Sequence, residues 1–563
     1  MRKTIKRLGA VLLAMAMAVS VLCTGALAAE TSNSITITTT SSGHTYEAYQ
    51  VFAGSTSATT DDKTSLGITG WGSGVKADEL VTALTTESNA ADSILSGKFT
   101  NILKKGNVAN GVAVDEDSAD AAQNVAASIK DFSDKGKEAK AFAKIVAAHL
   151  SETKTGSTET KNSDVTTGYK IDNLAAGYYL VKDEDNSIGA NKEDAYTNYI
   201  MEVVGAVKVE PKSDVPTVEK KIVENKAEKD ATTAKVGDVV NFELTGTLPS
   251  NYADYKEPYV YEFHDILSKG LTYNGDVKVY VKNDNEEVEI TGYTVTSTNA
   301  ATETPTDATT ITVKFTDLKT AKRKDNADVT IDKGSKIIVK YSATLNENAV
   351  VGEEGNTNTV NLVYSNNPNN TSTGTTKDDK VTVYTFQLNV TKVDGTNNGT
   401  RLAGAKFKLY YEKDGTKNYA TVNLSEGDNK DKITGWTATE TEGTVLTTDN
   451  DGNITVKGLK EGTYYLEETE APAGYNKLTA PVKVEITNKS DTISELKSVK
   501  ADDVDGSVDV DKASGTITIA NNKGSTLPST GGMGTKLFYT IGGILMAGAA
   551  IVLVVRKRRS DAE

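Results

Sequence analysis

Short runs of alternating apolar and polar residues, separated by turns rich in Asn, Asp and Gly, recur through most of this 563-residue chain. Because successive side chains of a strand point to opposite faces, such alternation indicates strands with one buried face. Beyond about residue 213 the runs follow one another closely without a helical period, which favours antiparallel β-sandwiches. They are residues 239–244, 277–281, 310–315, 337–343, 360–364, 387–393, 405–410, 463–466, 482–486 and 516–520.

The region before residue 213 combines two periods. Strand-like alternation occurs at residues 35–38, 177–181 and 199–209. Between these runs, residues 78–105 and 118–150 are rich in Ala, Leu, Lys and Glu, and apolar side chains recur there at helical spacing. The pattern predicts a β-sandwich with inserted helices.

The amino terminus has the order of a secretory signal peptide. Four basic residues within positions 2–7 precede an apolar run at 8–22, and Ala-Leu-Ala follows at 26–28. Cys23, the one cysteine of the chain, would leave with residues 1–28, so we expect no disulfide framework in the exported part. Lipid attachment at Cys23 is the alternative, although Leu22 stands where that signal has a small residue.

An apolar stretch at residues 537–555 lies near the carboxyl terminus. As a helix it would be about 28 Å long, which is enough to cross a bilayer core. The basic residues 556–559 follow directly, and by the positive-inside rule they stay in the cytoplasm. The pentapeptide Leu527-Pro528-Ser529-Thr530-Gly531 stands just before the span.

Composition and motifs argue against several functions. The chain has 62 Lys and Arg against 77 Asp and Glu, a net charge of −15, and this disfavours a nucleic-acid binder. His44, His149 and His264 lack the spacing of metal ligands, and no phosphate loop or nucleophile motif is present. We therefore expect no metal, no cofactor and no enzymatic turnover.

Several motifs resemble those of the major (backbone) pilins of Gram-positive, sortase-assembled pili. The pentapeptide, span and basic tail are similar to the sorting signal of that family. The third module resembles a CnaB-type domain at residues 390–394, 402–407 and 465–475, the last matching the E-box. The second module resembles a CnaA-type domain at residues 216–222, 261–265 and 364–368.

The resemblance implies a mainly β chain of tandem immunoglobulin-like sandwiches of CnaA and CnaB type. The first domain would contain the inserted helices, and a transmembrane helix would end the chain. The division that we expect is a signal peptide at 1–28, an N-terminal pilin domain at 29–212, a CnaA-type domain at 213–385, a CnaB-type domain at 386–525 and a sorting signal at 526–563.

The same families form Lys–Asn isopeptide bonds inside their folded domains. Burial lowers the pKa of a lysine amine and raises that of a carboxylic acid, so a neutral amine can attack the amide while the acid assists the departure of ammonia. Strand parity selects Lys392, Glu468 and Asn521 in the third module, with Asn522 as the alternative to Asn521.

In the second module the same parity argument selects Lys220, Asp265 as the acid and Asn366, with Lys221 and Asn367 as alternatives. The opening strand of the first module, residues 35–40, has no lysine, so we expect no such bond there.

Residues 207–212 resemble the pilin motif, although Glu210 replaces the usual Tyr. The resemblance implies that a sortase cleaves between Thr530 and Gly531, and that Lys212 of another copy attacks Thr530 to build a head-to-tail fibre that supports adhesion. The implied partners are pilin-specific and housekeeping sortases, further copies, minor pilins and peptidoglycan; no residue indicates a host ligand. A monomeric wall-anchored adhesin, or a minor pilin at the tip or base, is the alternative.

Overall fold

The computed structural model of the chain divides into two compact units. The first contains Met1–Val350 and Glu354–Tyr384, and the second contains Val351–Glu353 and Thr385–Glu563. The expected signal peptide with Cys23, the expected linking residue Lys212 and the pentapeptide 527–531 lie outside the described residues. The structure describes residues 33–560 apart from 40, 59–63, 101, 103–118, 134–135, 160, 162–164, 166, 189–192, 198, 204–205, 212–213, 256–257, 285, 301–302, 490–493 and 525–533.

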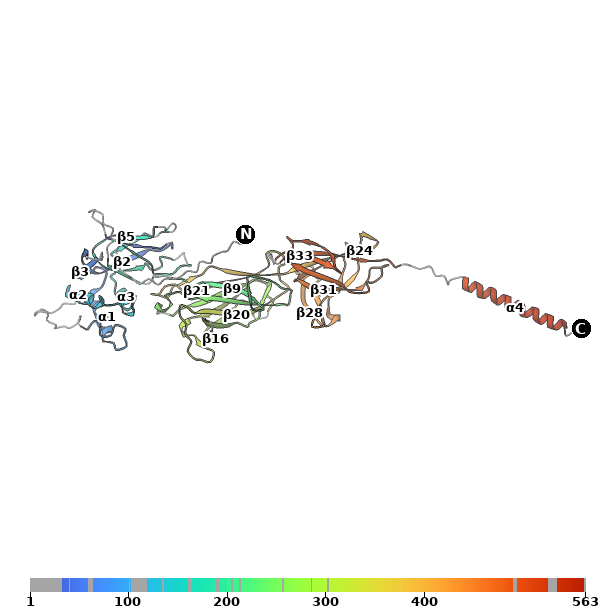
Figure 1. Cartoon of the computed structure of the whole chain (residues 1–563), viewed down its shortest axis with the longest axis horizontal. Helices are drawn as coiled ribbons and strands as arrows, with labels where there is room; N and C mark the ends of the chain where they lie inside the picture. The colour runs from blue at the N-terminus through green and yellow to red at the C-terminus, as the bar shows by residue number, and fades with distance from the viewer. Residues whose placement is uncertain are drawn as a thin grey trace, which may run out of the picture. The chain divides into compact units, whose positions relative to one another are not determined.

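Two small sheets and three helices form the amino-terminal part of the first unit (Figure 1). One sheet has the order β5-β1-β8 and the other β3-β2-β6-β7, with β4 paired to β2. The helices bury Leu80, Leu84, Phe142 and Val146 in one core with Phe52 of β2, which confirms the expected helical insertion. The bounds are β1 Asn33–Ile37, β2 Tyr46–Ala58, β3 Thr64–Trp71, α1 Ala77–Asn89, α2 Ala119–Ile129, α3 Lys137–Ala148, β4 Gly156–Ser157, β5 Tyr169–Leu174, β6 Gly177–Asp183, β7 Ile200–Val203 and β8 Ala206–Val209.

The rest of the first unit is a two-sheet sandwich. One sheet has the order β10-β9-β12-β20-β15-β16-β19, with β14 on β20, and the other β11-β23-β21-β13-β18-β17, with β22 on β21. Alternate residues of both sheets are buried in one apolar core, as the alternation predicted. The bounds are β9 Val218–Glu224, β10 Ala227–Lys229, β11 Ala231–Thr233, β12 Val239–Thr247, β13 Tyr261–Leu267, β14 Leu271–Tyr273, β15 Lys278–Asn283, β16 Glu286–Thr291, β17 Thr294–Ser297, β18 Thr309–Phe315, β19 Lys322–Arg323, β20 Lys336–Leu345, β21 Asn356–Ser365, β22 Thr373–Thr375 and β23 Asp379–Tyr384, with short 3-10 helices at Tyr252–Asp254 and Leu318–Thr320.

The second unit also contains two sheets. One has the order β25-β24-β36-β35, with β30 on β24, and the other β28-β27-β26-β31-β32-β33-β34, with β29 on β26. Its first strand, β24, is adjacent and parallel to its last, β36. The bounds are β24 Phe386–Asp394, β25 Asn397–Arg401, β26 Lys406–Lys413, β27 Thr416–Val422, β28 Ile433–Thr437, β29 Leu446–Thr447, β30 Asn453–Leu459, β31 Gly462–Glu470, β32 Val482–Asn488, β33 Leu496–Ala501, β34 Val504–Asp505, β35 Ser507–Asp509 and β36 Ser514–Asn521, with a 3-10 helix at Glu440–Glu442.

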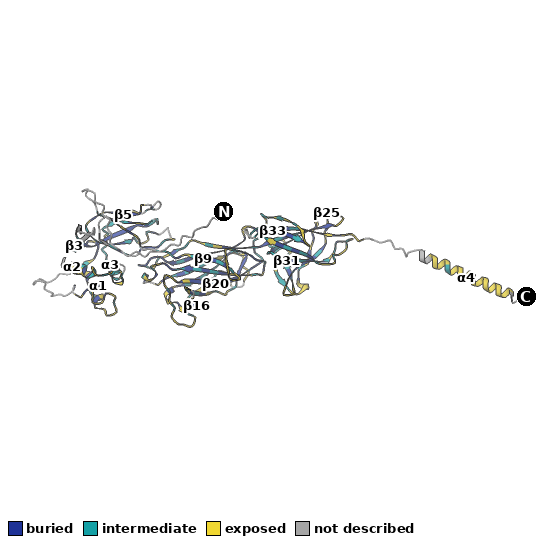
Figure 2. Ribbon diagram, in the orientation of Figure 1, coloured by how far each residue is buried: buried dark blue, intermediate teal, exposed yellow. Residues whose placement is uncertain are grey.

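Helix α4 (Gly534–Ser560) follows near the end of the chain. Its segment Leu537–Arg559 has a mean hydropathy of 2.3, and among the described residues it is the helix long and apolar enough to cross a membrane. Figure 2 shows this helix exposed along its length, whereas the strands of the sandwiches are largely buried. The expected fold class, mainly β with a C-terminal apolar helix, is confirmed.

Candidate functional site

Two lysine side chains lie in the sandwich cores. Lys220 on β9 and Lys392 on β24 each have 0% of their surface exposed, which lysine rarely tolerates without a partner. Local sequence explains their position, because strand alternation carries them inward together with apolar neighbours such as Ile222 and Val390.

In the second unit, Lys392 lies with both of its expected partners. Its Nζ donates a hydrogen bond to Oδ1 of Asn521 and lies 3.5 Å from Oε1 of Glu468. The Asn521 Nδ2 donates to Oε1 and Oε2 of Glu468 at 2.9 and 3.0 Å. All three side chains are buried. Lys392 and Asn521 come from the paired strands β24 and β36, while Glu468 comes from β31 in the other sheet.

Burial changes the pKa of Lys392, and backbone groups hydrogen-bond Glu468 and Asn521. Burial lowers the pKa of the Lys392 amine to about 8, against the opposing effect of the Glu468 charge. Deprotonation to the neutral, nucleophilic amine therefore costs less free energy here than in water. The Leu478 amide donates to Glu468 Oε2 at 2.7 Å, and the Asn476 carbonyl accepts a third hydrogen bond from Asn521 Nδ2 at 2.9 Å.

In the first unit, Lys220 lies with Asp265. The Lys220 Nζ donates to Asp265 Oδ1 at 2.6 Å and to the Tyr341 hydroxyl at 3.2 Å. Lys220 on β9 and Tyr341 on β20 belong to one sheet, and Asp265 on β13 belongs to the other, so the contact crosses the sandwich. Burial lowers the pKa of Lys220, in opposition to the Asp265 charge.

The structure does not bring Asn366, the expected partner, to this cluster. Val360 is the register partner of Asp265 on β21, and Asn366 lies six residues further along the chain. At about 3.4 Å per residue this is roughly 20 Å. Strand parity selected Asn366 because it is in phase with the inward-facing residues of β21, but parity alone does not give the position along the strand.

Asn358, on the same face of β21, takes that place. It pairs with Leu267, two residues from Asp265 on β13, and has no exposed surface. Its Nδ2 donates to the Tyr341 hydroxyl at 2.6 Å, the same oxygen that accepts from Lys220. Sequence reasoning missed Asn358 and Tyr341. The signal for Asn358 was its parity with Val360 and Leu362.

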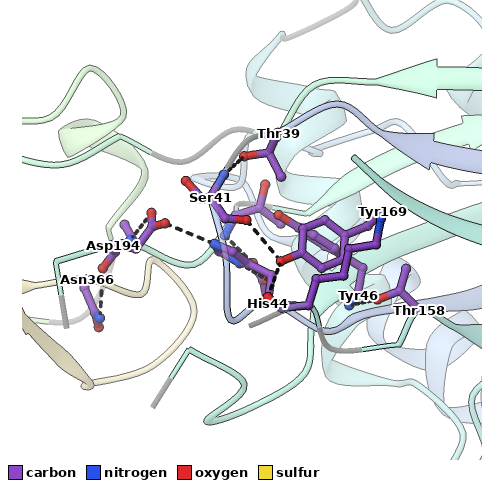
Figure 3. Close-up of polar contacts among 12 residues, drawn as sticks. Thr39, Ser41, His44, Tyr46, Thr158, Tyr169, Asp194 and Asn366 are labelled. Carbon is purple, nitrogen blue, oxygen red and sulfur yellow. Dashed lines mark hydrogen bonds and ion pairs between the residues drawn. The ribbon is translucent and has the colours of Figure 1, made fainter. Parts of the chain in front are cut away.

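Asn366 instead contacts a buried histidine site in the amino-terminal part of the unit (Figure 3). Its Nδ2 donates to the backbone carbonyl of Asp194 at 3.3 Å, and its Oδ1 accepts from Ser372 at 2.8 Å. The Asp194 carboxylate lies 3.3 Å from Nε2 of His44, and Asp183 lies 2.7 Å from Nδ1. Burial opposes the charged imidazole, but the two carboxylates outweigh it and raise the pKa of His44 to about 9.

The alternative residues lie outside both lysine clusters. Lys221 pairs with Asp230 and Glu219 at 2.7 and 3.0 Å. The Asn367 side chain accepts from the Asn369 amide, and Asn522 is exposed. In the described part of residues 33–209 no lysine is buried, and the absence of a cross-link there stays a prediction.

Three family models match the chain in order. They are the Gram-positive pilin backbone subunit 2, Cna-B-like domain at residues 236–368, the prealbumin-like fold domain at 386–500 and the LPXTG cell wall anchor motif at 519–562. The chain belongs to the Gram-positive backbone pilins. The model matching the second module is described as Cna-B-like, so its CnaA-type assignment stays a proposal. The anchor motif and the apolar helix make this pilin a surface protein anchored to the cell wall.

Individual proteins are similar to this pilin along much of its length. The trypsin-resistant surface T6 protein of Streptococcus pyogenes is 27% identical over 69% of this chain and 75% of its own. The type 1 fimbrial subunit of Actinomyces viscosus is 27% identical over 63% and 67%. The crystal structure of the group B streptococcus pilus 2b backbone protein is 28% identical, covers 55% of this chain and 99% of that one, and superposes with a TM-score of 0.39.

Proposed function

We propose that this pilin is the structural subunit of a covalent pilus, polymerised by a sortase and strengthened by internal isopeptide bonds. Sortase would cleave between Thr530 and Gly531 and transfer the Thr530 carbonyl to Lys212 of another copy. The matched anchor motif includes Thr530 and Gly531, which supports cleavage there, and the matched backbone-subunit domain supports the role in a fibre. A housekeeping sortase would join the finished fibre to peptidoglycan, and minor pilins would complete it.

The arrangement of Lys392, Glu468 and Asn521 is the observation that carries the internal bonds. The buried amine would pass a proton to Glu468 and attack Cγ of Asn521. Glu468, which contacts Nδ2, would return that proton as Nδ2 leaves in ammonia. Lysine and asparagine give one secondary amide and one ammonia, and folding provides the proximity. In the first unit we propose Lys220 and Asp265 with Asn358 in place of Asn366.

A blot of cell-wall extracts tests the polymerisation. We expect a ladder of high-mass bands from wild-type cells, and a single band from a Lys212→Ala strain because the acceptor amine is lost. Lys208→Ala, which removes an exposed lysine of the same segment, is the matched control and should keep the ladder. A single band from wild-type cells would support the monomeric adhesin instead, and a ladder in the Lys212→Ala strain would assign the link to another lysine.

Mass spectrometry of the full chain tests the internal bonds. We expect a mass short by two ammonia molecules, with linked tryptic peptides carrying Lys392 with Asn521 and Lys220 with Asn358. Asn358→Ala should remove one loss, whereas Asn366→Ala should keep both. A full, uncorrected mass would exclude both bonds.

A further inference from the structure

The Tyr341 hydroxyl holds both nitrogen atoms that would react in the first unit. It accepts a hydrogen bond from Lys220 Nζ at 3.2 Å and from Asn358 Nδ2 at 2.6 Å. The side chain projects from β20 and is buried, and its ring stacks on Phe242 of the neighbouring strand β12 with the ring centroids 5.3 Å apart. The phenol oxygen therefore lies between the nucleophile and the leaving group in a site closed to water.

Two other polar atoms of this site have no partner. Asp265 Oδ2 and Asn358 Oδ1 are buried and make no hydrogen bond, although a buried polar atom without a partner destabilises the folded chain. Protonation of Asp265 at Oδ2 would supply a donor for the Asn358 carbonyl oxygen. In that role Asp265 would polarise the carbonyl, and a different group would supply the proton that the leaving nitrogen needs.

In the second unit a different group is next to the nitrogen that would leave. There Asn521 Nδ2 contacts both oxygens of Glu468 directly, at 2.9 and 3.0 Å, and the Asn476 carbonyl at 2.9 Å. In the first unit Asn358 Nδ2 has the Tyr341 oxygen as its hydrogen-bond acceptor. The two sites therefore differ in the group next to the leaving nitrogen.

We propose that Tyr341 is a catalytic residue of the Lys220–Asn358 bond and relays a proton from Nζ to Nδ2. This rests on the proposed function, since it presupposes that the bond forms. When Nζ attacks Cγ of Asn358, Nζ must lose a proton and Nδ2 gains a lone pair. The Tyr341 O–H turns to Nδ2 and donates its proton while its oxygen takes the proton from Nζ. Ammonia leaves, the amide remains and Tyr341 is neutral again.

The environment of Tyr341 suits a relay that stays neutral. Burial is the main cause that raises its pKa well above the usual value, and the Asp265 charge adds to it. A neutral phenol both donates and accepts, whereas a phenolate could not return a proton to the leaving nitrogen. A phenylalanine at this position would keep the packing on Phe242 and remove the hydroxyl, and with it the relay and the two hydrogen bonds that the hydroxyl accepts.

The test follows linkage in full-chain Tyr341→Phe protein. Linked tryptic peptides are measured by mass spectrometry as the freshly purified protein is incubated at constant pH. We expect Lys220–Asn358 linkage to slow by about 10²-fold, the lower range for positioned acid–base groups. Lys392–Asn521 linkage in the same molecules should be unchanged, which makes the second unit an internal control.

Two further variants separate the possible outcomes. Tyr273→Phe removes a hydroxyl from the ring that packs edge-on against Tyr341 at 5.9 Å, and it should link at the wild-type rate. Unlinked Tyr341→Phe should keep a cooperative unfolding transition of the first unit, as unlinked Asn358→Ala does, showing that slow linkage is not misfolding. Tyr341→Phe linking as fast as Tyr273→Phe would overturn the relay alone, whereas a wild-type chain without the Lys220–Asn358 peptide would overturn the proposed bond itself.

Discussion

At the level of single residues, this pilin places ionisable groups where water cannot solvate them. Lys220 and Lys392 each face a carboxylate inside a sandwich, and their low pKa follows from burial. A charge in such a site costs several kcal/mol unless it is paired or neutralised. A covalent bond between the amine and an amide would remove the charge permanently. The proposed reaction would therefore remove the free-energy cost of burying a lysine, and the same burial activates the amine.

His44 shows the opposite balance and predicts a pH dependence. Its pKa rises from 6.5 to about 9 in the folded chain, so its contribution to stability is complete below pH 6.5 and is lost as pH rises through 9. At about 1.4 kcal/mol per pH unit the free energy of unfolding should fall by roughly 3 kcal/mol across this range. Hydrogen exchange of peptides from the first unit, followed against pH, measures the change.

Variants at two histidines check the assignment. His44→Gln should be less stable at pH 6.5 and should lose the slope, because no group titrates between the two carboxylates. His149→Gln, at a histidine whose ring Nδ1 hydrogen-bonds the backbone carbonyl of Ile145 one turn earlier, should keep the wild-type slope. An unchanged slope in His44→Gln would assign the pH dependence to another group.

At the level of strands, the two candidate bonds connect different elements. Lys392 and Asn521 lie on the neighbouring parallel strands β24 and β36 of one sheet. Lys220 and Asn358 lie on β9 and β21, in different sheets of the first-unit sandwich. One bond would therefore join the first and last strands of its module side by side, and the other would fasten two sheets together.

Gly515 allows β36 to approach β33. We therefore predict that the methyl group added by Gly515→Ala lowers stability. A Cβ at this position would lie 2.7 Å from Val499 Cγ1 and 2.8 Å from its Cβ. Gly515→Ala should destabilise the second unit by about 1–3 kcal/mol, as overpacking does. It should also delay linkage of Asn521, which lies on the same strand. Urea unfolding and linked-peptide analysis measure the two effects.

Gly435→Ala is the matched control within the same unit. Its Cβ would meet only the Thr421 hydroxyl, at 3.3 Å, and that side chain can turn away. Equal stability losses in Gly515→Ala and Gly435→Ala would show that the contact with Val499 does not matter.

At the level of the whole molecule, the proposed bonds would give a pulled fibre a covalent path through each linked module. Force entering along β24 would pass at Lys392 to Asn521, and the chain between these two residues, which are 129 positions apart, would bear no load. In the first unit the path would pass from Lys220 to Asn358. Neither bond depends on cysteine, so reducing agents would leave both intact.

The closed loops predict a stability loss on removal of each bond. By the chain-entropy relation used for disulfides, a loop of this length contributes about 5 kcal/mol. Asn521→Ala should lower the free energy of unfolding of the second unit by that amount, and Asn358→Ala should do so for the first. Differential scanning calorimetry of the full chain measures both transitions. Asn522→Ala, at the exposed neighbour, should leave both unchanged, and a loss there as large as in Asn521→Ala would reject cross-linking as the cause.

Much of this protein follows from local sequence. Alternation with period two located the strands and the inward lysines, since pleating is a local property of the backbone. Helical spacing in residues 118–150 likewise indicated the region of α2 and α3. The apolar length of residues 537–555 predicted the terminal helix, because a span depends on length and hydropathy alone.

The tertiary structure decided which positions along paired strands lie opposite one another. Asn358 and Asn366 share one face of the chain, and only the register of β13 against β21 brings Asn358 rather than Asn366 near Asp265. Tyr341 has no motif of its own and joins the site because β20 lies two strands from β9 across β12. Sequence by itself thus determined which side chains point inward, whereas the pairing of distant strands determined which of them meet, because pairing depends on contacts between residues far apart in the chain.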